Sequence, residues 1–464
     1  MEVPREAGRM PNSLLRAAIR AADVTYETLA ATVRMTAAEA GEVLRTNRSA
    51  VAHWVAGAEP APATARYLAE ALSRHLGRAV SVGDIGLAAR SPQPGPDWGA
   101  DTLTALNELG SRDLDVARRR ALSTAAYSVA ALAVPGQDWW ERMAERPAAR
   151  PAAHHRRVGR GDLAAVRDMV AMFSRVDQRH GGGHARTAAV QYLTTDVSAY
   201  LGGRFADDRV RREMYSAAGE LAYLSGWMAF DNAEHAAAQH WFTLAVRLAA
   251  EADDAPLAGH VLRAMAHQAV DLGHARQALD LADASVDGPR YALAAPRERA
   301  LLGVVHARAF AAAGQKQAAA AALVRAENDL SAAAPGDDEP ARVFFFGEAS
   351  LAHETACTLR DTGDLAGAQR EFRRSVRTRR AATFTRTHAV TLGYLGSVQA
   401  RQGAIEEACA TWSRALDAMD VIHSARARRT ATDMRQALSP VRRRGIPAVT
   451  ALDARAAAYL TETA

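Results

Sequence analysis

The chain has 464 residues, of which 49% are apolar, and a formal net charge of +5. This length corresponds to roughly three domains, and the apolar share is large enough to form packed cores. The two cysteines, Cys357 and Cys409, are too few for a disulfide framework, so we expect a cytoplasmic protein in which both thiols are buried. No apolar run reaches the ~20 residues that cross a bilayer, so no membrane contact is expected. The mild positive charge permits nucleic-acid binding without requiring it.

Alanine-rich segments with few β-branched runs predict an all-α chain. Residues 1–90 are expected to form a first domain of short helices. Helices are predicted over residues 12–22, from residue 25 onward, over residues 47–55 and over residues 62–76. Residues 36–39 fit a capping box, which predicts the start of a further short helical turn.

The segment 47–55 has the pattern of a DNA-reading helix. Val51 and Trp54 anchor its apolar side, which leaves the amino-terminal and opposite positions free to enter a major groove. The candidate DNA-binding residues are Asn47, Arg48, Ser49, Ala50 and His53. Arginine can read guanine or phosphate, and asparagine can read adenine. Because residues 1–90 carry eleven arginines against nine acidic residues, a helical docking domain without DNA affinity is the alternative.

Residues 91–160 are expected to connect this domain to the rest of the chain. Residues 91–101 are rich in proline and glycine, which predicts a linker. A helical segment is expected over residues 102–134, and the composition of residues 146–160 predicts another flexible stretch.

One pattern recurs five times between residues 215 and 419: a small residue, a turn residue seven positions later, and further apolar or small residues after the turn. The turn residues are Ala233, Gly273, Gly314, Gly363 and Gly403, and the small residues are Gly226, Ala266, Ala307, Ala356 and Gly396. This pattern predicts paired helices that approach closely at the small residues and stack on their neighbours to bury their apolar faces. We expect such an array over residues 161–464, with residues 161–201 as a degenerate sixth unit.

The spacing resembles the tetratricopeptide repeat, which implies an α-solenoid whose first helices line a concave face. On that face the resemblance places Tyr223, Trp227, Arg263, His267, Arg308, His353 and Arg360 as candidate effector-groove residues, together with Glu220 and His260. Arginines and histidines suit a carboxylate or a phosphate, and the aromatic rings suit an apolar or ring-bearing group. The alternative is an ordinary solvated groove with these side chains paired to acids. The arginines of residues 424–444 are expected to form a solvated helix face.

Known catalytic patterns are missing from the sequence, so no enzyme activity, cofactor or metal site is expected. The glycine-rich residues 181–186 lack the lysine of a phosphate-binding loop. They predict a helix stop and restart, with His184 and Arg186 facing a pocket.

Residues 25–31 and 49–57 resemble helix-turn-helix domains of the XRE/Cro-repressor type, with about eleven additional residues between the two segments. With residues 181–186, 221–231 and 344–349, the chain resembles actinobacterial transcriptional regulators that join this domain to tetratricopeptide repeats. The architecture is also similar to the peptide-pheromone receptors of the RRNPP type, which are commonly dimers. The resemblance implies a regulator of development or secondary metabolism. Its partners would be double-stranded DNA, a second copy of the chain, and a peptide, small-molecule or protein effector. The alternative is a tetratricopeptide adaptor whose first domain does not bind DNA.

Overall fold

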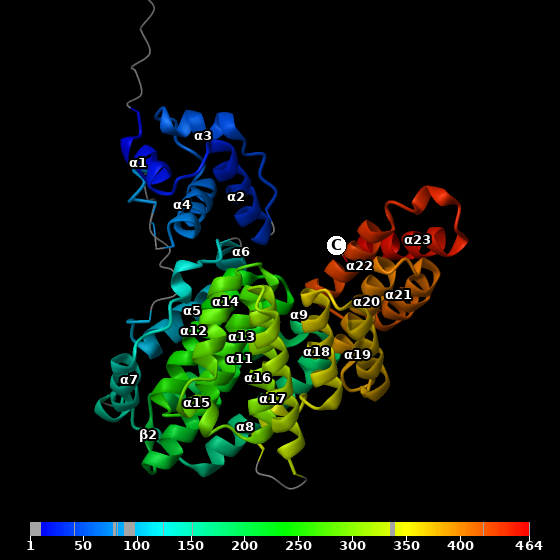
Figure 1. Ribbon diagram of the computed structural model, residues 1–464. Helices are drawn as coiled ribbons and strands as arrows, with labels where there is room; N and C mark the ends of the chain where they lie inside the picture. The colour runs from blue at the N-terminus through cyan, green and yellow to red at the C-terminus, as the bar shows by residue number, and fades with distance from the viewer. Residues whose placement is uncertain are drawn as a thin grey trace, which may run out of the picture.

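The computed structural model describes residues 11–40, 42–77, 80, 82–87, 98–123, 125–150, 152–334, 339–420 and 422–463. Their regular structure is almost entirely helical, as predicted (Figure 1). The strands within these ranges are β1 (Arg157–Val158) and β2 (Arg204–Phe205), which pair in parallel. No helix in these ranges is long and apolar enough to cross a membrane.

The amino-terminal unit contains α1 (Ser13–Ala21), α2 (Tyr26–Glu39), α3 (Arg48–Val55) and α4 (Pro62–Leu76). Three of these helices begin at a side-chain cap, because Asn12, Thr25 and Asn47 each accept a hydrogen bond from a backbone N–H three residues later. The capping box predicted at residues 36–39 is wrong. Thr36 lies inside α2, where its hydroxyl donates to the carbonyl of Thr32 at 2.9 Å. Met35 before it and Ala37 and Ala38 after it are good helix formers and continue the helix.

The connector packs on the array and is more ordered than its composition predicts. It consists of α5 (Thr102–Leu114), α6 (Val116–Ser123), η1 (Ala130–Leu132) and α7 (Gln137–Ala149). The single helical segment predicted over residues 102–134 is therefore interrupted, and residues 146–149 belong to a helix. Trp139 holds α7 in place by donating to the carbonyl of Trp98 at 3.0 Å. Residues 91–97 of the predicted linker lie outside the described residues.

The rest of the chain is a repeat-like stack of helices. In chain order it contains α8 (Arg160–His180), α9 (Gly182–Tyr192), η2 (Leu193–Val197), α10 (Ser198–Leu201), α11 (Asp208–Asp231), α12 (His235–Glu251), α13 (Ala255–Asp271), α14 (Ala275–Ser285), α15 (Pro289–Ala292), α16 (Pro296–Ala312), α17 (Lys316–Ala332), η3 (Ala341–Val343), α18 (Glu348–Thr362), α19 (Leu365–Thr378), α20 (Thr385–Arg401), α21 (Ile405–Met419), α22 (Ala425–Leu438), η4 (Arg442–Arg444) and α23 (Pro447–Glu462). The five predicted pairs are α11–α12, α13–α14, α16–α17, α18–α19 and α20–α21, and the members of each pair pack on each other.

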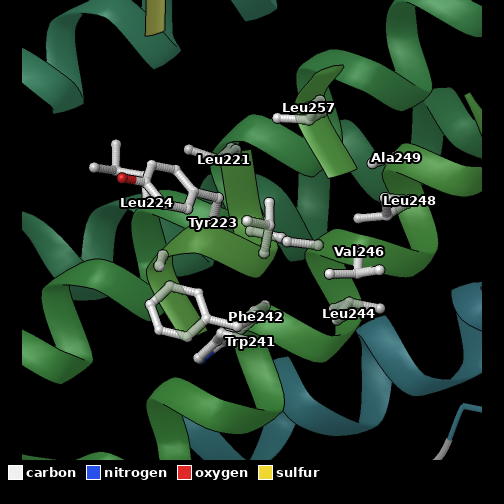
Figure 2. Close-up of a cluster of buried hydrophobic side chains, with 14 of the residues drawn as sticks. Leu221, Tyr223, Leu224, Trp241, Phe242, Leu244, Val246, Leu248, Ala249 and Leu257 are labelled. Carbon is white, nitrogen blue, oxygen red and sulfur yellow. The ribbon is translucent and has the colours of Figure 1, made fainter. Parts of the chain in front are cut away.

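The five predicted turn residues lie between the members of these pairs. All five have positive φ, from 60° at Ala233 to 97° at Gly363. The predicted close approach is confirmed at Gly226, where a Cβ would lie 2.7 Å from the ring of Phe242. Figure 2 shows this part of the core, where side chains of α11, α12 and α13 meet, among them Tyr223, Phe242 and Leu257.

The array also closes on itself, because the α8–α9 turn meets the residues before α22. The N–H of His423 donates to the carbonyl of His180 at 2.8 Å, and the N–H of Gly183 donates to the carbonyl of His423 at 3.0 Å. The N–H of Gly182 donates to Asp231 at 2.9 Å. These contacts join the turn between α8 and α9 to the start of α22 and to the end of α11. The inner faces of the helices therefore surround the interior of the array.

The amino-terminal unit lies on one edge of the array with α3 at its far side (Figure 1). Arg74 of α4 donates to both carboxylate oxygens of Glu39, at 2.9 and 2.6 Å. The ring of Tyr127, in the connector, stacks on His274, in the turn between α13 and α14, at 5.6 Å between centroids. A buried interface therefore joins the unit to the second helix pair of the array.

Candidate functional site

Two regions carry the residues singled out from the sequence, and the first is the surface of α3. Arg48, Ser49 and His53 are exposed on it, as is the cap residue Asn47, while Ala50 is half-buried. The opposite side is anchored by Val51 and Trp54, which are buried. The Oδ1 atom of Asn47 accepts from the N–H of Ala50 at 2.9 Å, so this oxygen already serves the helix and the amide nitrogen is left for other contacts.

The second region is a cavity at the centre of the array, with about 70 Å³ available to the centres of water molecules. A single water needs roughly 10–15 Å³ by this measure, so the space suits a small molecule. The lining residues come from the first helix of every pair, from α8 and α22, and from the connections before α18 and before α20. They are Gln178, Trp227, Arg263, His267, Leu301, Val305, Phe345, Phe346, Ser350, His353, Glu354, Arg379, Arg386, Thr387, Val390 and Arg426.

The candidate groove residues are divided between this cavity and a neighbouring one. Trp227, Arg263, His267 and His353 line the central cavity. Arg308 and Arg360 line a second cavity of about 510 Å³, and Arg426 lines both. Tyr223 lines neither, because its hydroxyl lies behind Arg263 and accepts a hydrogen bond from it at 3.0 Å.

The alternative of an ordinary solvated groove is wrong for the central residues. Arg263, His267 and His353 are all buried, and Arg263 is only 2% exposed. Gln178 of α8 and Arg426 of α22 line the same cavity as these three side chains.

Arg386 is held by two buried carboxylates and Arg308 by two half-buried ones. Arg386 donates to Asp231 and to Asp177, each at 2.9 Å. Burial raises the pKa of Asp177 to about 6, against the opposing effect of Arg386. Arg308 donates to Asp271 at 3.0 Å and to Glu354 at 3.3 Å. These two arginines therefore neutralise acids of the fold.

Arg426 shows that the expected solvated arginine face at residues 424–444 is wrong at one position. Its guanidinium lies over the ring of Phe230 at 5.2 Å and within 3.8 Å of Asp271. Several other arginines of this segment point outward, for example Arg442, which pairs with Asp453. Arg426 turns inward because it begins α22 next to the loop that closes the array.

Arg263 differs from these arginines because its polar contacts are neutral. It donates to the hydroxyl of Tyr223 and lies 3.0 Å from Nε2 of His260. The Nδ1 atom of His260 lies 3.0 Å from Glu298, so the ring proton resides on Nδ1 and Nε2 is the acceptor. Burial and the charge of Arg263 lower the pKa of His260 to about 4, which keeps the ring neutral. The Nε atom of Arg263 is buried without a hydrogen-bond partner among the described residues.

Arg379, between α19 and α20, also makes its hydrogen bonds to neutral groups. It donates to the carbonyl of Ala349 at 2.9 Å and to the hydroxyl of Ser375 at 3.1 Å. No carboxylate of the described chain forms an ion pair with Arg263 or Arg379. The Nε atom of Arg379, like that of Arg263, is buried without a hydrogen-bond partner among the described residues. Burial lowers the pKa of Arg379 to about 10, an effect that Arg386 increases and Glu354 opposes.

The two histidines of the cavity are neutral for the same physical reason. Burial and the charge of Arg308 lower the pKa of His267 well below its usual value, while burial and Arg379 do so for His353. The Nδ1 atom of His353 lies 2.9 Å from the hydroxyl of Thr391. The cavity thus holds neutral rings beside two cations that lack counter-charges.

The sequence interpretation missed Arg379, Arg386 and Gln178, and misplaced Arg186. Arg379 lies in the connection before α20 and Gln178 lies on α8, so the repeat pattern does not mark them. Arg186 does not face a cavity described here. It pairs with Asp113 of α5 and with Glu234, each at 2.7 Å, and so fixes the connector to the array. His184 lies between the rings of His180 and His423.

Comparison with known protein families gives a result for the amino-terminal unit. A search of curated proteins finds no significant match to the chain. Residues 15–88, which run from α1 through the end of the amino-terminal unit, match the sequence model of a family described as the SP15 N-terminal domain.

Proposed function

We propose that the chain is a cytoplasmic, DNA-binding transcriptional regulator whose helix array holds an effector. The observation that carries this proposal is α3, which is anchored by Val51 and Trp54 and presents Arg48, Ser49 and His53 to solvent. A helix anchored on one side and polar on the other can enter a major groove. In this proposal the unit is a helix-turn-helix domain of the XRE type with a lengthened α2, and the array is an α-solenoid of the tetratricopeptide type.

The placement of α13 supports a link between effector and DNA. Arg263 and His267 on α13 line the central cavity. The turn after the same helix carries His274, which stacks on Tyr127 and lies 3.8 Å from Glu39 of α2. A ligand that moves α13 would therefore change the position of the amino-terminal unit. In a homodimer this movement would change the separation of the two α3 helices, which sets the spacing of the half-sites that the dimer can bind.

The proposal is tested by selecting sequences from a random duplex DNA library with the full-length chain. We expect an enriched motif and an affinity that falls with added salt. Arg48→Ala should weaken binding and reduce the salt slope by about 1 if the guanidinium contacts phosphate, and adding His53→Ala should abolish binding. Arg325→Ala is the matched control, because Arg325 is an exposed arginine on α17. A chain that enriches no sequence, or a double variant that binds like the unaltered chain, contradicts the proposal.

An adaptor is the second candidate, favoured by one feature of the amino-terminal unit. Eight residues, 40–47, separate α2 from α3, whereas the compact motif has a 3–4-residue turn. Capture of a defined protein by the full-length chain, with no salt-dependent DNA affinity, would support the adaptor.

A further inference from the structure

We infer that the central cavity is a binding site for a small organic carboxylate, whose oxygens contact Arg263 and Arg379 and whose apolar part lies against Trp227 and Phe345. This inference deepens the proposed function, because it names the chemical class of the effector. It rests on geometry and charge inside the array and needs no assumption about DNA.

The first argument is the contrast between arginines in one small region. Arg308 and Arg386 each bind two carboxylates. Arg263 and Arg379 are equally buried, at 2% and 8% exposure, yet only neutral groups contact them. A buried cation without a counter-charge is costly, and an anion from solution would remove that cost.

The second argument is that the neutral contacts position each guanidinium and leave donors unused. Glu298 holds His260 in the tautomer that presents an acceptor to Arg263. The carbonyl of Ala349 and the hydroxyl of Ser375 hold Arg379. Both Nε atoms are buried without a partner in the described chain, as are those of Arg308 and Arg386, so the difference lies in the missing carboxylates. Planar guanidinium groups with free N–H donors match a carboxylate.

The third argument concerns the rest of the cavity. Leu301, Val305, Phe345, Phe346 and Val390 form an apolar part of its lining. The ring of Trp227 lies 5.6 Å from the guanidinium of Arg263. The ligand therefore needs an apolar group next to its anionic one.

The lining also disfavours larger or more highly charged ligands. Glu354 lies on the same surface and would repel a dianion. The space of about 70 Å³ for the centres of water molecules is small, which favours a small ligand over a helical peptide segment. A small monoanion such as an arylalkanoate fits these limits better than a phosphate or a peptide.

The test is calorimetric titration of the full-length chain, in a buffer free of chloride, with phenylacetate, phenylacetamide, inorganic phosphate and chloride. We expect saturable binding of phenylacetate only, because phenylacetamide has the same shape without the charge. Equal binding of the amide, or binding of phenylacetate no tighter than that of chloride, would overturn the inference. Tighter binding of phosphate would overturn the choice of a carboxylate.

Variants separate a binding role from a structural one. Arg263→Met and Arg379→Met should each weaken phenylacetate binding by roughly ten- to a hundredfold, as loss of a charge-assisted hydrogen bond implies. Each change leaves neutral acceptors without their donor but no buried acid without its cation, so the midpoint of thermal unfolding without ligand should fall less than in an arginine variant that strands carboxylates. Arg386→Met is the matched control, and its midpoint should fall because Asp177 and Asp231 lose their cation. Unchanged phenylacetate affinity in both variants, or midpoints that fall as in the control, would contradict the inference.

These titrations are made without DNA, so their outcome does not depend on whether the chain binds DNA. A chain that binds phenylacetate and no DNA overturns the regulator and supports the cavity assignment. A chain that selects a DNA motif and ignores phenylacetate supports the regulator and overturns the cavity assignment.

Discussion

Arg386 donates a hydrogen bond to Asp177 at 2.9 Å, although the two residues are 209 positions apart in the chain. Arg386 belongs to α20, in the last of the five predicted helix pairs, and Asp177 belongs to α8, the first helix of the array. Both side chains are buried. This ion pair therefore joins the first helix of the array to α20, beside the contact of the α8–α9 turn with His423.

Replacing Arg386 by methionine should lower the free energy of unfolding by about 3–5 kcal/mol near neutral pH, because Asp177 and Asp231 would remain buried without their cation. The loss should be smaller near pH 5, because the raised pKa of Asp177 leaves its carboxyl group largely protonated there and a protonated carboxyl needs no cation. Urea unfolding at both pH values measures this difference. Arg325→Met, on the exposed side of α17, is the control and should change stability by less than about 0.5 kcal/mol. A loss no larger than that of the control would show that the pair contributes nothing.

Ala233→Gly should stabilise the chain by about 1 kcal/mol. Ala233 has a φ of 60°, a conformation that costs energy for a residue with a Cβ. The same substitution at Ala320, an exposed position inside α17, should destabilise by about 1 kcal/mol, since glycine is a poor helix former. Thermal unfolding of the two variants should give shifts of opposite sign, and shifts of equal sign would refute the strain argument.

Gly182→Ala should destabilise the closed array by about 1–3 kcal/mol. An added Cβ would lie 2.7 Å from the Cα of Met228 and close to its carbonyl oxygen, so the α8–α9 turn would have to move away from α11. Gly161→Ala is the control, because a Cβ there meets nothing within 4 Å. Hydrogen exchange at the N–H groups of Gly183 and His423 should become faster in the first variant only.

Glu70 should make stability depend on pH between about 4.5 and 7. Burial raises its pKa from the ordinary value of 4.5 to about 7, despite its ion pair with Arg74. The folded chain therefore binds a proton in this window that the unfolded chain has lost, and the free energy of unfolding falls as pH rises through it. Glu70→Gln should remove this part of the pH dependence. Denaturant unfolding from pH 4.5 to 8 compares the two chains, and identical slopes would refute the assignment.

Both cysteines should be unreactive in the folded protein. Cys357 and Cys409 are buried, as the sequence predicts, and burial raises the pKa of the Cys357 thiol to about 12. Because the thiolate is the reactive form, a thiol reagent should label neither residue until denaturant is added, when both should react. Ser331→Cys, at an exposed position near the end of α17, should add one thiol that reacts at once. Rapid labelling of the unaltered folded chain would contradict the buried placement.

The helix pairs follow from the sequence because their determinants are local. A turn residue, the small residue before it and the apolar residues after it fall within about five helical turns. Gly226 and Phe242, for example, meet within a single pair. Caps such as Asn47 act over three residues. In contrast, residues 36–39 fit a cap pattern and yet continue α2, because helix propensity and burial outweigh a local signal of this strength.

The sequence by itself determined an all-α chain of paired helices, and it placed arginines and aromatic residues on the inner faces of the pairs. Only the tertiary structure decided which of those arginines have a counter-charge. Arg308 finds Asp271 and Arg386 finds Asp177 across 37 and 209 residues, whereas Arg263 and Arg379 find neutral acceptors. Helix formation depends on neighbours within a turn or two of the chain. The charge balance of a buried site depends on how stacked helices are aligned and on where the array closes. No short segment of the sequence determines either the alignment or the closure.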